Sequence, residues 1–208
     1  MSLFVTIEGP EGSGKTSAMQ IVKARLESEG HSVVMTREPG GTKISEQIRN
    51  VILDPDNTEM DPRTEALLYA ASRRQHLVEK IWPSLQEGKI VFCDRYLDSS
   101  LAYQGVARGL GVDRILEVNS YATEGTFPDL TVLFDIDPVL GLERINRNKD
   151  REVNRLDMEK ISFHNQVRSG YLELSRRFPE RYFVVDASRP LEEVSAVVFK
   201  KIAEMLRK

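Results

Sequence analysis

The sequence predicts a three-layer α/β fold in which helices flank a five-stranded parallel sheet. Short apolar runs recur along the chain, and each is followed by a longer segment of helical periodicity. This alternation favours parallel strands joined by crossover helices. The run Ile-Val-Phe-Cys at residues 90–93 is apolar throughout, as expected of a strand that is covered on both faces. The expected strands are 3–7, 33–35, 90–93, 130–134 and 182–185.

Helices are expected in the segments between these strands. Pro62 and Pro138 each follow an aspartate, which is the pattern of a first-turn proline behind an N-cap. Pro83 lies inside the third segment, where a proline is expected to kink or end the helix. The expected helices are 15–29, 43–53, 62–87, 112–123, 138–147, 156–177 and 191–206.

Length and composition limit the classes of protein to consider. A chain of 208 residues is expected to form one domain, over 1–208. Its 29 basic and 32 acidic residues give a net charge of −3, which offers no excess cation for a duplex DNA surface. Cys93 is the only cysteine, so an intrachain disulfide is excluded. No secretory leader or membrane-length apolar run is apparent, and we expect a cytoplasmic protein without membrane or nucleic-acid partners.

The strongest signal is the segment GPEGSGKT at residues 9–16, between the first expected strand and the first expected helix. It matches the P-loop pattern G-x-x-x-x-G-K-[ST], whose glycines let backbone N–H groups wrap closely around phosphate oxygens. Lys15 is placed to reach the β and γ phosphates and Thr16 to bind Mg²⁺. The predicted ATP-binding residues here are Gly9, Pro10, Glu11, Gly12, Ser13, Gly14, Lys15, Thr16 and Ser17.

A P-loop alone does not identify the reaction, because kinases, GTPase switches and ATP-driven motors share it. A GTPase would normally show Asn-Lys-x-Asp for guanine. The nearest candidate, Asn-Lys-Asp at residues 148–150, has the wrong spacing. It lies in the densest charge run of the chain, which is either a solvated loop or a mobile lid.

Several polar residues follow the expected strands at the edge where ligands gather in an open α/β sheet. Asp94 and Arg95 come directly after the strand 90–93, where the carboxylate suits Mg²⁺ and the guanidinium suits a phosphate. The alternative is a simple ion pair. Tyr69 and Arg73 are four residues apart, so they share one helix face. They suit a base and its phosphate, although Tyr69 alone also suits core packing.

Five segments, read together, resemble the bacterial-type thymidylate kinases, which are P-loop nucleoside monophosphate kinases. They are IEGPEGSGKT, TREPGG, LLYAASRRQH, CDRYLDSSLAYQG and FPDL, and they occur in the family's order. The similarity spans nearly the whole chain, including FHNQVRSGYLEL and VVDAS. The resemblance implies the P-loop NTPase fold with a short lid at 146–155, a homodimer, and Mg²⁺-dependent transfer of the ATP γ-phosphoryl group to dTMP.

The resemblance also implies roles on the acceptor side. Arg73 and Arg95 would grip the dTMP phosphate, and Tyr69 would stack on thymine. Tyr103 would lie against the deoxyribose and leave too little room for a 2′-hydroxyl. The implied substrate-binding residues are Glu11, Arg37, Glu38, Pro39, Tyr69, Arg73, Arg95, Ser99, Ser100, Tyr103 and Gln104, of which Arg73, Ser100 and Gln104 would meet polar groups of the base or its surroundings.

This P-loop carries Glu11 and no arginine at its variable positions, and in the family that form takes its catalytic arginine from the lid. Arg147 and Arg151 are the candidates, with Arg144 and Arg155 as flanking alternatives. The implied catalytic residues are Lys15, Arg95, Arg147, Arg151 and Glu11. The implied metal site is Thr16 and Asp94, and Arg144, Asp186 and Ala187 would join the ATP site.

The chain departs from the family pattern at Tyr69, where phenylalanine is common, at Ser72, where aspartate is common, and at residues 154–157. Two other functions stay open on the sequence. One is a kinase for another nucleoside monophosphate or for a nucleoside, and the other is a nonenzymatic nucleotide-dependent switch. Acceptor-dependent release of ADP distinguishes the enzymes from the switch.

Overall fold

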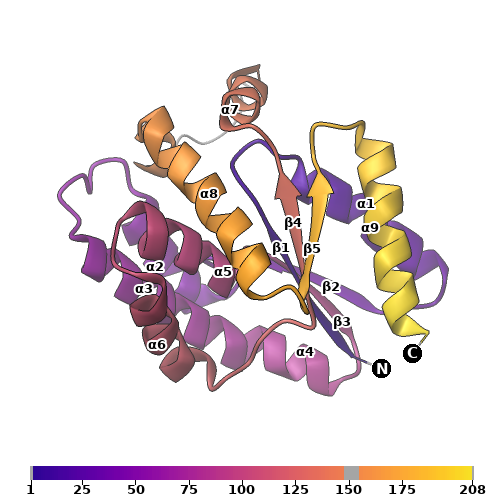
Figure 1. The fold of residues 1–208 in the computed structure, drawn as a ribbon. Coiled ribbons are helices and arrows are strands. Elements are labelled where there is room, and N and C mark those ends of the chain that lie inside the picture. The colour runs from indigo at the N-terminus through magenta and orange to yellow at the C-terminus, as the bar shows by residue number, and fades with distance from the viewer. Residues whose placement is uncertain (1, 148–154, 208) are drawn as a thin grey trace.

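The computed structural model describes residues 2–147 and 155–207. Its centre is a parallel sheet of five strands in the order β2-β3-β1-β4-β5 (Figure 1). The strands are β1 (Leu3–Glu8), β2 (Val33–Arg37), β3 (Ile90–Asp94), β4 (Leu130–Asp135) and β5 (Tyr182–Asp186). The predicted α/β architecture and each predicted strand are confirmed, and every strand runs one or two residues further at its carboxyl end.

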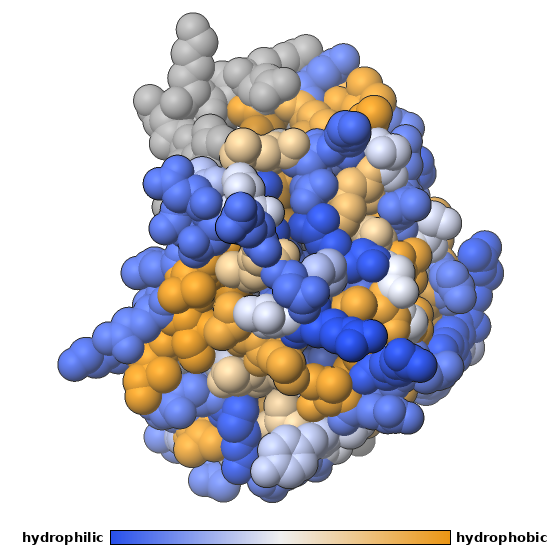
Figure 2. All heavy atoms as spheres, turned by 90° about the vertical axis from the view of Figure 1, so that its left-hand side faces the viewer, coloured by the Kyte–Doolittle hydropathy of each residue, from blue (hydrophilic) through white to orange (hydrophobic). Residues whose placement is uncertain are grey.

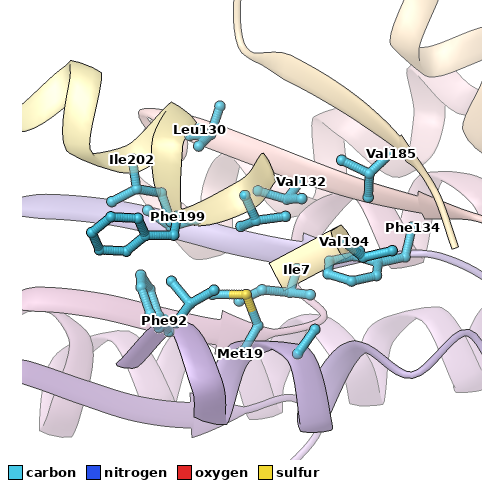
Figure 3. Close-up of a cluster of buried hydrophobic side chains, with 14 of the residues drawn as sticks. Ile7, Met19, Phe92, Leu130, Val132, Phe134, Val185, Val194, Phe199 and Ile202 are labelled. Carbon is cyan, nitrogen blue, oxygen red and sulfur yellow. The ribbon is translucent and has the colours of Figure 1, made fainter. Parts of the chain in front are cut away.

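Two hydrophobic cores form because strand side chains alternate between the faces of the sheet. On one face, Ile7 and Phe92 pack with Met19 of α1 (Lys15–Ser28) and Phe199 of α9 (Leu191–Leu206), as Figure 3 shows. On the other face, Phe4 and its neighbours meet the remaining large helices. Both faces are therefore covered, as the uninterrupted apolar strand 90–93 predicted.

The second face is covered by α2 (Lys43–Leu53), α3 (Pro62–His76), α6 (Val112–Thr123) and α8 (Ile161–Arg177), with α7 (Pro138–Arg147) beside α8. The predicted cap of α3 is confirmed, because the Asp61 carboxylate accepts hydrogen bonds from the backbone N–H groups of Arg63 and Thr64 at 2.9 and 3.1 Å. The Asp137 carboxylate likewise accepts the Val139 N–H group at 2.9 Å. The start of α8 differs, because Arg155–Met158 forms the separate 3-10 turn η3.

Pro83 does not end the third helix, which leaves the other predicted outcome, an irregularity within a helical segment that continues past the proline. The helix passes from α3 through the π-helical turn η1 (Leu77–Ile81) into α4 (Trp82–Gln86). Pro83 lies in the first turn of α4, where the missing N–H group is not needed. The π-helical turn η1 directly precedes α4 and has wider backbone hydrogen bonding than an α-helix. It therefore changes the pattern of backbone hydrogen bonds that Pro83 would interrupt in a regular α-helix.

A helical segment that the sequence analysis did not assign follows β3. It consists of α5 (Leu97–Ser100) and the π-helix η2 (Leu101–Ala107). Its residues are largely buried and pack against α8 and α6. Predicted substrate residues of the segment 99–105 therefore lie on a helix, where their side chains have fixed directions. In the part of the chain that the structure describes, no helix is long and apolar enough to cross a membrane.

Candidate active site

The P-loop joins the end of β1 to the start of α1, as predicted. The Lys15 ammonium group donates to the carbonyl oxygens of Gly9 and Pro10 at 3.0 and 2.9 Å, and to the Ser13 hydroxyl at 3.2 Å. Burial and the positive charge of Arg95 lower the pKa of Lys15 to about 8. The loop thus holds a desolvated cation at the positive end of a helix, an arrangement that favours polyphosphate binding.

The P-loop and α7 approach each other closely through backbone atoms. A Cβ atom added at Gly141 of α7 would lie 2.3 Å from the carbonyl oxygen of Glu11, and one added at Gly12 would lie 2.0 Å from the carbonyl oxygen of Gly141. Gly12 also has φ +71°, which disfavours other residues. The shape of the loop therefore depends on glycine on both sides of this contact.

We expect Gly141→Ala to weaken ATP binding about tenfold, because overpacking of a fixed backbone contact costs on the order of 1 to 3 kcal/mol. Helix propensity alone predicts the opposite, since alanine favours a helix by about 1 kcal/mol over glycine. Calorimetric titration with an Mg-ATP analogue measures the affinity. Glu143→Ala changes an exposed residue of the same helix and should bind as the wild type does. Equal affinity in both variants would contradict the steric argument.

The predicted metal residues lie together at the carboxyl edge of the sheet. The Thr16 hydroxyl donates to the Asp94 carboxylate at 2.7 Å, although 78 residues separate them in the sequence. A hydroxyl and a carboxylate beside a phosphate loop are the oxygen ligands that Mg²⁺ prefers. The donor set therefore fits the ion that the sequence predicts.

Two pockets border the P-loop. The first, called the acceptor pocket, includes Glu11 of the loop. Its other lining residues are Glu38, Pro39, Arg49, Leu53, Tyr69, Arg73, Arg95, Tyr96, Ser99, Tyr103, Gln104 and Leu156. The second, called the nucleotide pocket, includes Ser13 and Gly14 of the loop. Its other lining residues are Ser17, Ala18, Phe134, Arg144, Ala187, Ser188, Arg189, Pro190, Leu191 and Val194. One phosphate-binding loop thus borders two ligand-sized spaces.

Arg95 connects the P-loop to the acceptor pocket. Its guanidinium donates to Glu11 at 2.7 Å, to the Tyr171 hydroxyl at 3.1 Å and to the Ser99 hydroxyl at 3.4 Å. Burial lowers the pKa of Arg95, but the negative charge of Glu11 more than offsets this and raises it, so the side chain is a permanent cation. Among the described residues, these contacts use three of the five N–H donors of Arg95, which leaves two for an anion. The backbone of Arg95 has φ +67°, a strained conformation that is typical of functional sites.

Arg73 is fully buried at the back of the same pocket. Its guanidinium donates to Glu38 at 2.8 Å, to the backbone oxygen of Tyr96 at 2.8 Å, to the Ser100 hydroxyl at 3.1 Å and to Asn119. Four of its five N–H donors are thus taken within the described residues. One donor suits a single carbonyl group better than it suits a phosphate.

Some supporting residues escaped the sequence analysis. The Glu38 carboxylate binds His76 of α3 at 3.0 Å, and the other ring nitrogen of His76 lies 2.6 Å from the Thr36 hydroxyl. The sequence analysis did not single out His76, because its partners Glu38 and Thr36 lie 38 and 40 residues away along the chain. Arg49 of α2, which donates to the Pro39 carbonyl at 3.1 Å, was also missed. No local motif marks either residue.

Glu8 is a further unpredicted residue, and it lies behind the acceptor pocket. Its carboxylate accepts from the backbone N–H of Tyr96 at 2.7 Å, from the Ser99 hydroxyl at 2.6 Å and from the Tyr171 hydroxyl at 2.8 Å. Burial, together with the negative charge of Asp98, raises its pKa to about 7. The carboxyl group links β1, α5 and α8 directly behind Arg95.

The raised pKa of Glu8 predicts a pH-dependent stability. Because the folded state binds this proton more tightly than the unfolded state, whose pKa is 4.5, the free energy of unfolding falls as pH rises from about 4.5 to about 7. Glu8→Gln removes the titration, so we expect the variant to gain on the order of 3 kcal/mol relative to the wild type between pH 4.5 and pH 8. Denaturant unfolding at both pH values measures this, and Glu204→Gln, at an exposed site, is the control. A difference that does not change with pH would contradict the prediction.

Other predicted residues fall in different places. Arg37 and Ser100 do not line the acceptor pocket: Arg37 is exposed and pairs with Glu46 at 2.9 Å, and Ser100 lies behind Arg73. Arg144 and Ala187 line the nucleotide pocket and are joined by a 2.9 Å hydrogen bond. Asp186 shapes that pocket from outside, because its carboxylate binds the Ser188 hydroxyl at 2.6 Å and its backbone N–H at 3.0 Å.

The predicted lid lies mostly outside the described residues. Arg151 belongs to 148–154, which the structure does not describe, and Arg147 is described only as the last residue of α7. Arg155 lies on the acceptor side, where it donates to the Ile52 carbonyl at 3.0 Å and to Glu65. The identity of the catalytic lid arginine therefore stays a prediction.

Comparisons with known proteins identify the family of the chain. The family model described as thymidylate kinase matches residues 7–198. The chain is 57% identical over 203 residues to the thymidylate kinase of Geobacillus sp. (strain WCH70), covering 98% of this chain and 97% of the relative. It is 59% identical over 206 residues to that of Anoxybacillus flavithermus, covering 99% of each. The chain belongs to the thymidylate kinase family.

A solved thymidylate kinase, from Ehrlichia chaffeensis, supports the fold of this family member. The two structures superimpose with a TM-score of 0.77 at 33% sequence identity, covering 97% of this chain and 98% of the other. The predicted P-loop NTPase fold and the predicted kinase function are thus confirmed. Thymidylate kinases transfer a phosphoryl group from ATP to dTMP, and the two pockets beside the P-loop are the places to seek these substrates.

Proposed function

We propose that this thymidylate kinase binds Mg-ATP along the P-loop with its adenine in the nucleotide pocket, and dTMP in the acceptor pocket. The observation that carries the proposal is that the P-loop contributes residues to both pockets. Glu11 borders the acceptor pocket, while Ser13 and Gly14 border the nucleotide pocket. Two substrates placed there approach each other at the loop, which suits in-line phosphoryl transfer.

The number of N–H donors that each pocket arginine keeps favours a different ligand group for each of them. Arg95, with two N–H donors left, suits the dTMP phosphate, and Arg49 is a second cation of the same pocket. Arg73, with one donor left, suits a carbonyl oxygen of thymine better than the phosphate grip that the resemblance also implied. Tyr69 and Tyr103 line the space between and suit the faces of base and sugar.

The chain's own groups supply the charge stabilisation that phosphoryl transfer needs. Lys15 would leave the loop carbonyls and bind the β and γ phosphates, while the phosphate oxygen of dTMP attacks the γ-phosphorus. Thr16 and Asp94 would hold Mg²⁺, which neutralises charge on the phosphate oxygens. A lid arginine, with Arg147 and Arg151 as candidates, would complete the site and exclude water.

An ADP-release assay with Mg-ATP across dTMP, dUMP, AMP and thymidine tests the function. We expect dTMP to give the highest kcat/KM, with omission of Mg²⁺ abolishing turnover. Activity confined to AMP or to thymidine would overturn the acceptor assignment. ATP binding without any acceptor-dependent ADP release would indicate a nucleotide-dependent switch.

The assembly and the compartment are also proposed. Leu67 of α3 and Tyr121 of α6 are 58% and 91% exposed. A groove at these helices is lined by apolar side chains and two arginines, namely Arg63, Ala66, Leu67, Gly109, Leu110, Arg114, Ile115 and Val118. Figure 2 shows hydrophobic patches among hydrophilic side chains on the face of the molecule that is on the left in Figure 1. The groove suits the homodimer that the family resemblance implies, acting in the cytoplasm. Sedimentation equilibrium that gives a monomer mass at micromolar concentration would contradict the dimer.

A further inference from the structure

Glu65, in the first turn of α3, is a fully buried carboxylate that neither the P-loop nor the acceptor contacts require. One carboxylate oxygen accepts a hydrogen bond from the Gln104 amide nitrogen at 2.8 Å. The other accepts from Arg155, and Arg108 donates to both oxygens at 3.4 Å. Glu65 therefore links a pocket residue of η2 to two cations outside the pocket.

The Glu65 carboxylate stays ionised at neutral pH. Burial raises its pKa, but the hydrogen bonds from Arg155 and Gln104 and the charges of Arg108 and Arg155 outweigh burial and lower it. An ionised carboxylate only accepts hydrogen bonds. The Glu65 carboxylate therefore fixes the orientation of the Gln104 amide, because only the amide nitrogen can donate to it. In a flipped amide, the Gln104 oxygen would face the carboxylate oxygen and the two would repel each other.

The bound nitrogen leaves the amide oxygen of Gln104 as the group without a partner. Gln104 is buried and lines the acceptor pocket, and among the described residues its amide oxygen accepts no hydrogen bond. Arg73, in the same pocket, keeps one N–H donor. Two residues that line the pocket thus each keep one unused group among the described contacts, an acceptor on Gln104 and a donor on Arg73.

This pair matches the edge of a 4-oxo pyrimidine. Thymine and uracil carry an N3–H donor beside the O4 acceptor, whereas cytosine carries an N3 acceptor beside a 4-amino donor. The Gln104 oxygen would accept from N3–H and Arg73 would donate to O4. Against cytosine, both contacts would place like groups together, which leaves buried polar groups unpaired and costs affinity.

We propose that Glu65 is a positioning residue that fixes the Gln104 amide with its oxygen toward the pocket, and so makes the enzyme select 4-oxo over 4-amino pyrimidine monophosphates. The inference rests on the proposed binding of dTMP in the acceptor pocket. It adds a residue outside the pocket as the origin of the selectivity.

The test is a double-mutant cycle with Glu65→Gln and Gln104→Met, in which kcat/KM is measured for dTMP and for dCMP. A glutamine at 65 can donate as well as accept, so the Gln104 amide is free to flip. We expect the dTMP to dCMP ratio of kcat/KM to fall about tenfold or more in Glu65→Gln, mainly through the KM for dTMP. In the Gln104→Met background, Glu65→Gln should change the ratio no further, because Glu65 acts through Gln104.

The control is Glu59→Gln, the same change at an exposed site six residues earlier in the sequence, which should keep the wild-type ratio. An unchanged ratio in folded Glu65→Gln, or a further fall in the Gln104→Met background, would overturn the inference. Thermal unfolding checks that each variant folds. If Glu65→Gln does not fold, the same cycle with Glu65→Asp decides, since aspartate keeps the charge for Arg155 and Arg108 but withdraws the carboxylate from Gln104.

Failure of the inference differs from failure of the proposed function. A wild-type enzyme that ignores dTMP would refute the function before any variant is made. A wild-type enzyme that phosphorylates dTMP, combined with an unchanged ratio in the variants, would refute the role of Glu65 alone.

Discussion

Lys15→Met is expected to lower kcat/KM for ATP by a factor of about 10² to 10³, the size of effect seen when one preorganised donor to a developing charge is removed. Methionine retains most of the aliphatic stem, so packing around α1 changes little while the ammonium group is lost. The three hydrogen bonds that Lys15 donates within the loop are lost as well. Steady-state assays with ATP varied at saturating dTMP measure the result.

The matched control for Lys15→Met is Lys23→Met, two turns further along α1. Lys23 forms an i,i+4 ion pair with Glu27 at 2.6 Å, a surface contact of about 0.3 to 0.5 kcal/mol. This variant should keep wild-type kinetics and nearly the wild-type melting temperature. Turnover of Lys15→Met within threefold of the wild type would show that the P-loop lysine does not stabilise the transferring phosphoryl group.

Arg95→Met is expected to lower kcat/KM for dTMP by a factor of about 10² to 10³. The substitution removes the cation that would bind the dTMP phosphate and breaks its ion pair with the partly buried Glu11. The KM for dTMP should rise. Arg95→Lys should recover only part of the loss, since an ammonium group keeps the charge without the planar fork. Initial rates with dTMP varied at saturating ATP separate these variants.

Arg176→Met is the control for Arg95, because Arg176 is an exposed residue of α8 and the change in charge is the same. Binding of an Mg-ATP analogue without acceptor should also survive in Arg95→Met more completely than dTMP turnover does. A normal KM for dTMP in Arg95→Met would place the acceptor phosphate elsewhere, and Arg49 would then be the next residue to test.

Arg37 illustrates where local patterns stop predicting a site. The segment TREPGG correctly marked the loop after β2, whose Glu38 and Pro39 line the acceptor pocket. The direction of the Arg37 side chain depends on Glu46 of α2, which pairs with it through both carboxylate oxygens at 2.9 and 3.0 Å. A partner nine residues away on another element is a tertiary contact, and the motif alone cannot include it.

The sequence alone determined the parallel sheet, the phosphate loop and the family, because alternating strands and helices and the spacing of the P-loop are local patterns. Only the tertiary structure decided which groups stand behind the substrate residues. Glu8 meets Tyr171 across 163 residues and Glu65 meets Arg155 across 90. Buried polar groups find their partners through the packing of whole elements, and no short segment of the sequence encodes that packing.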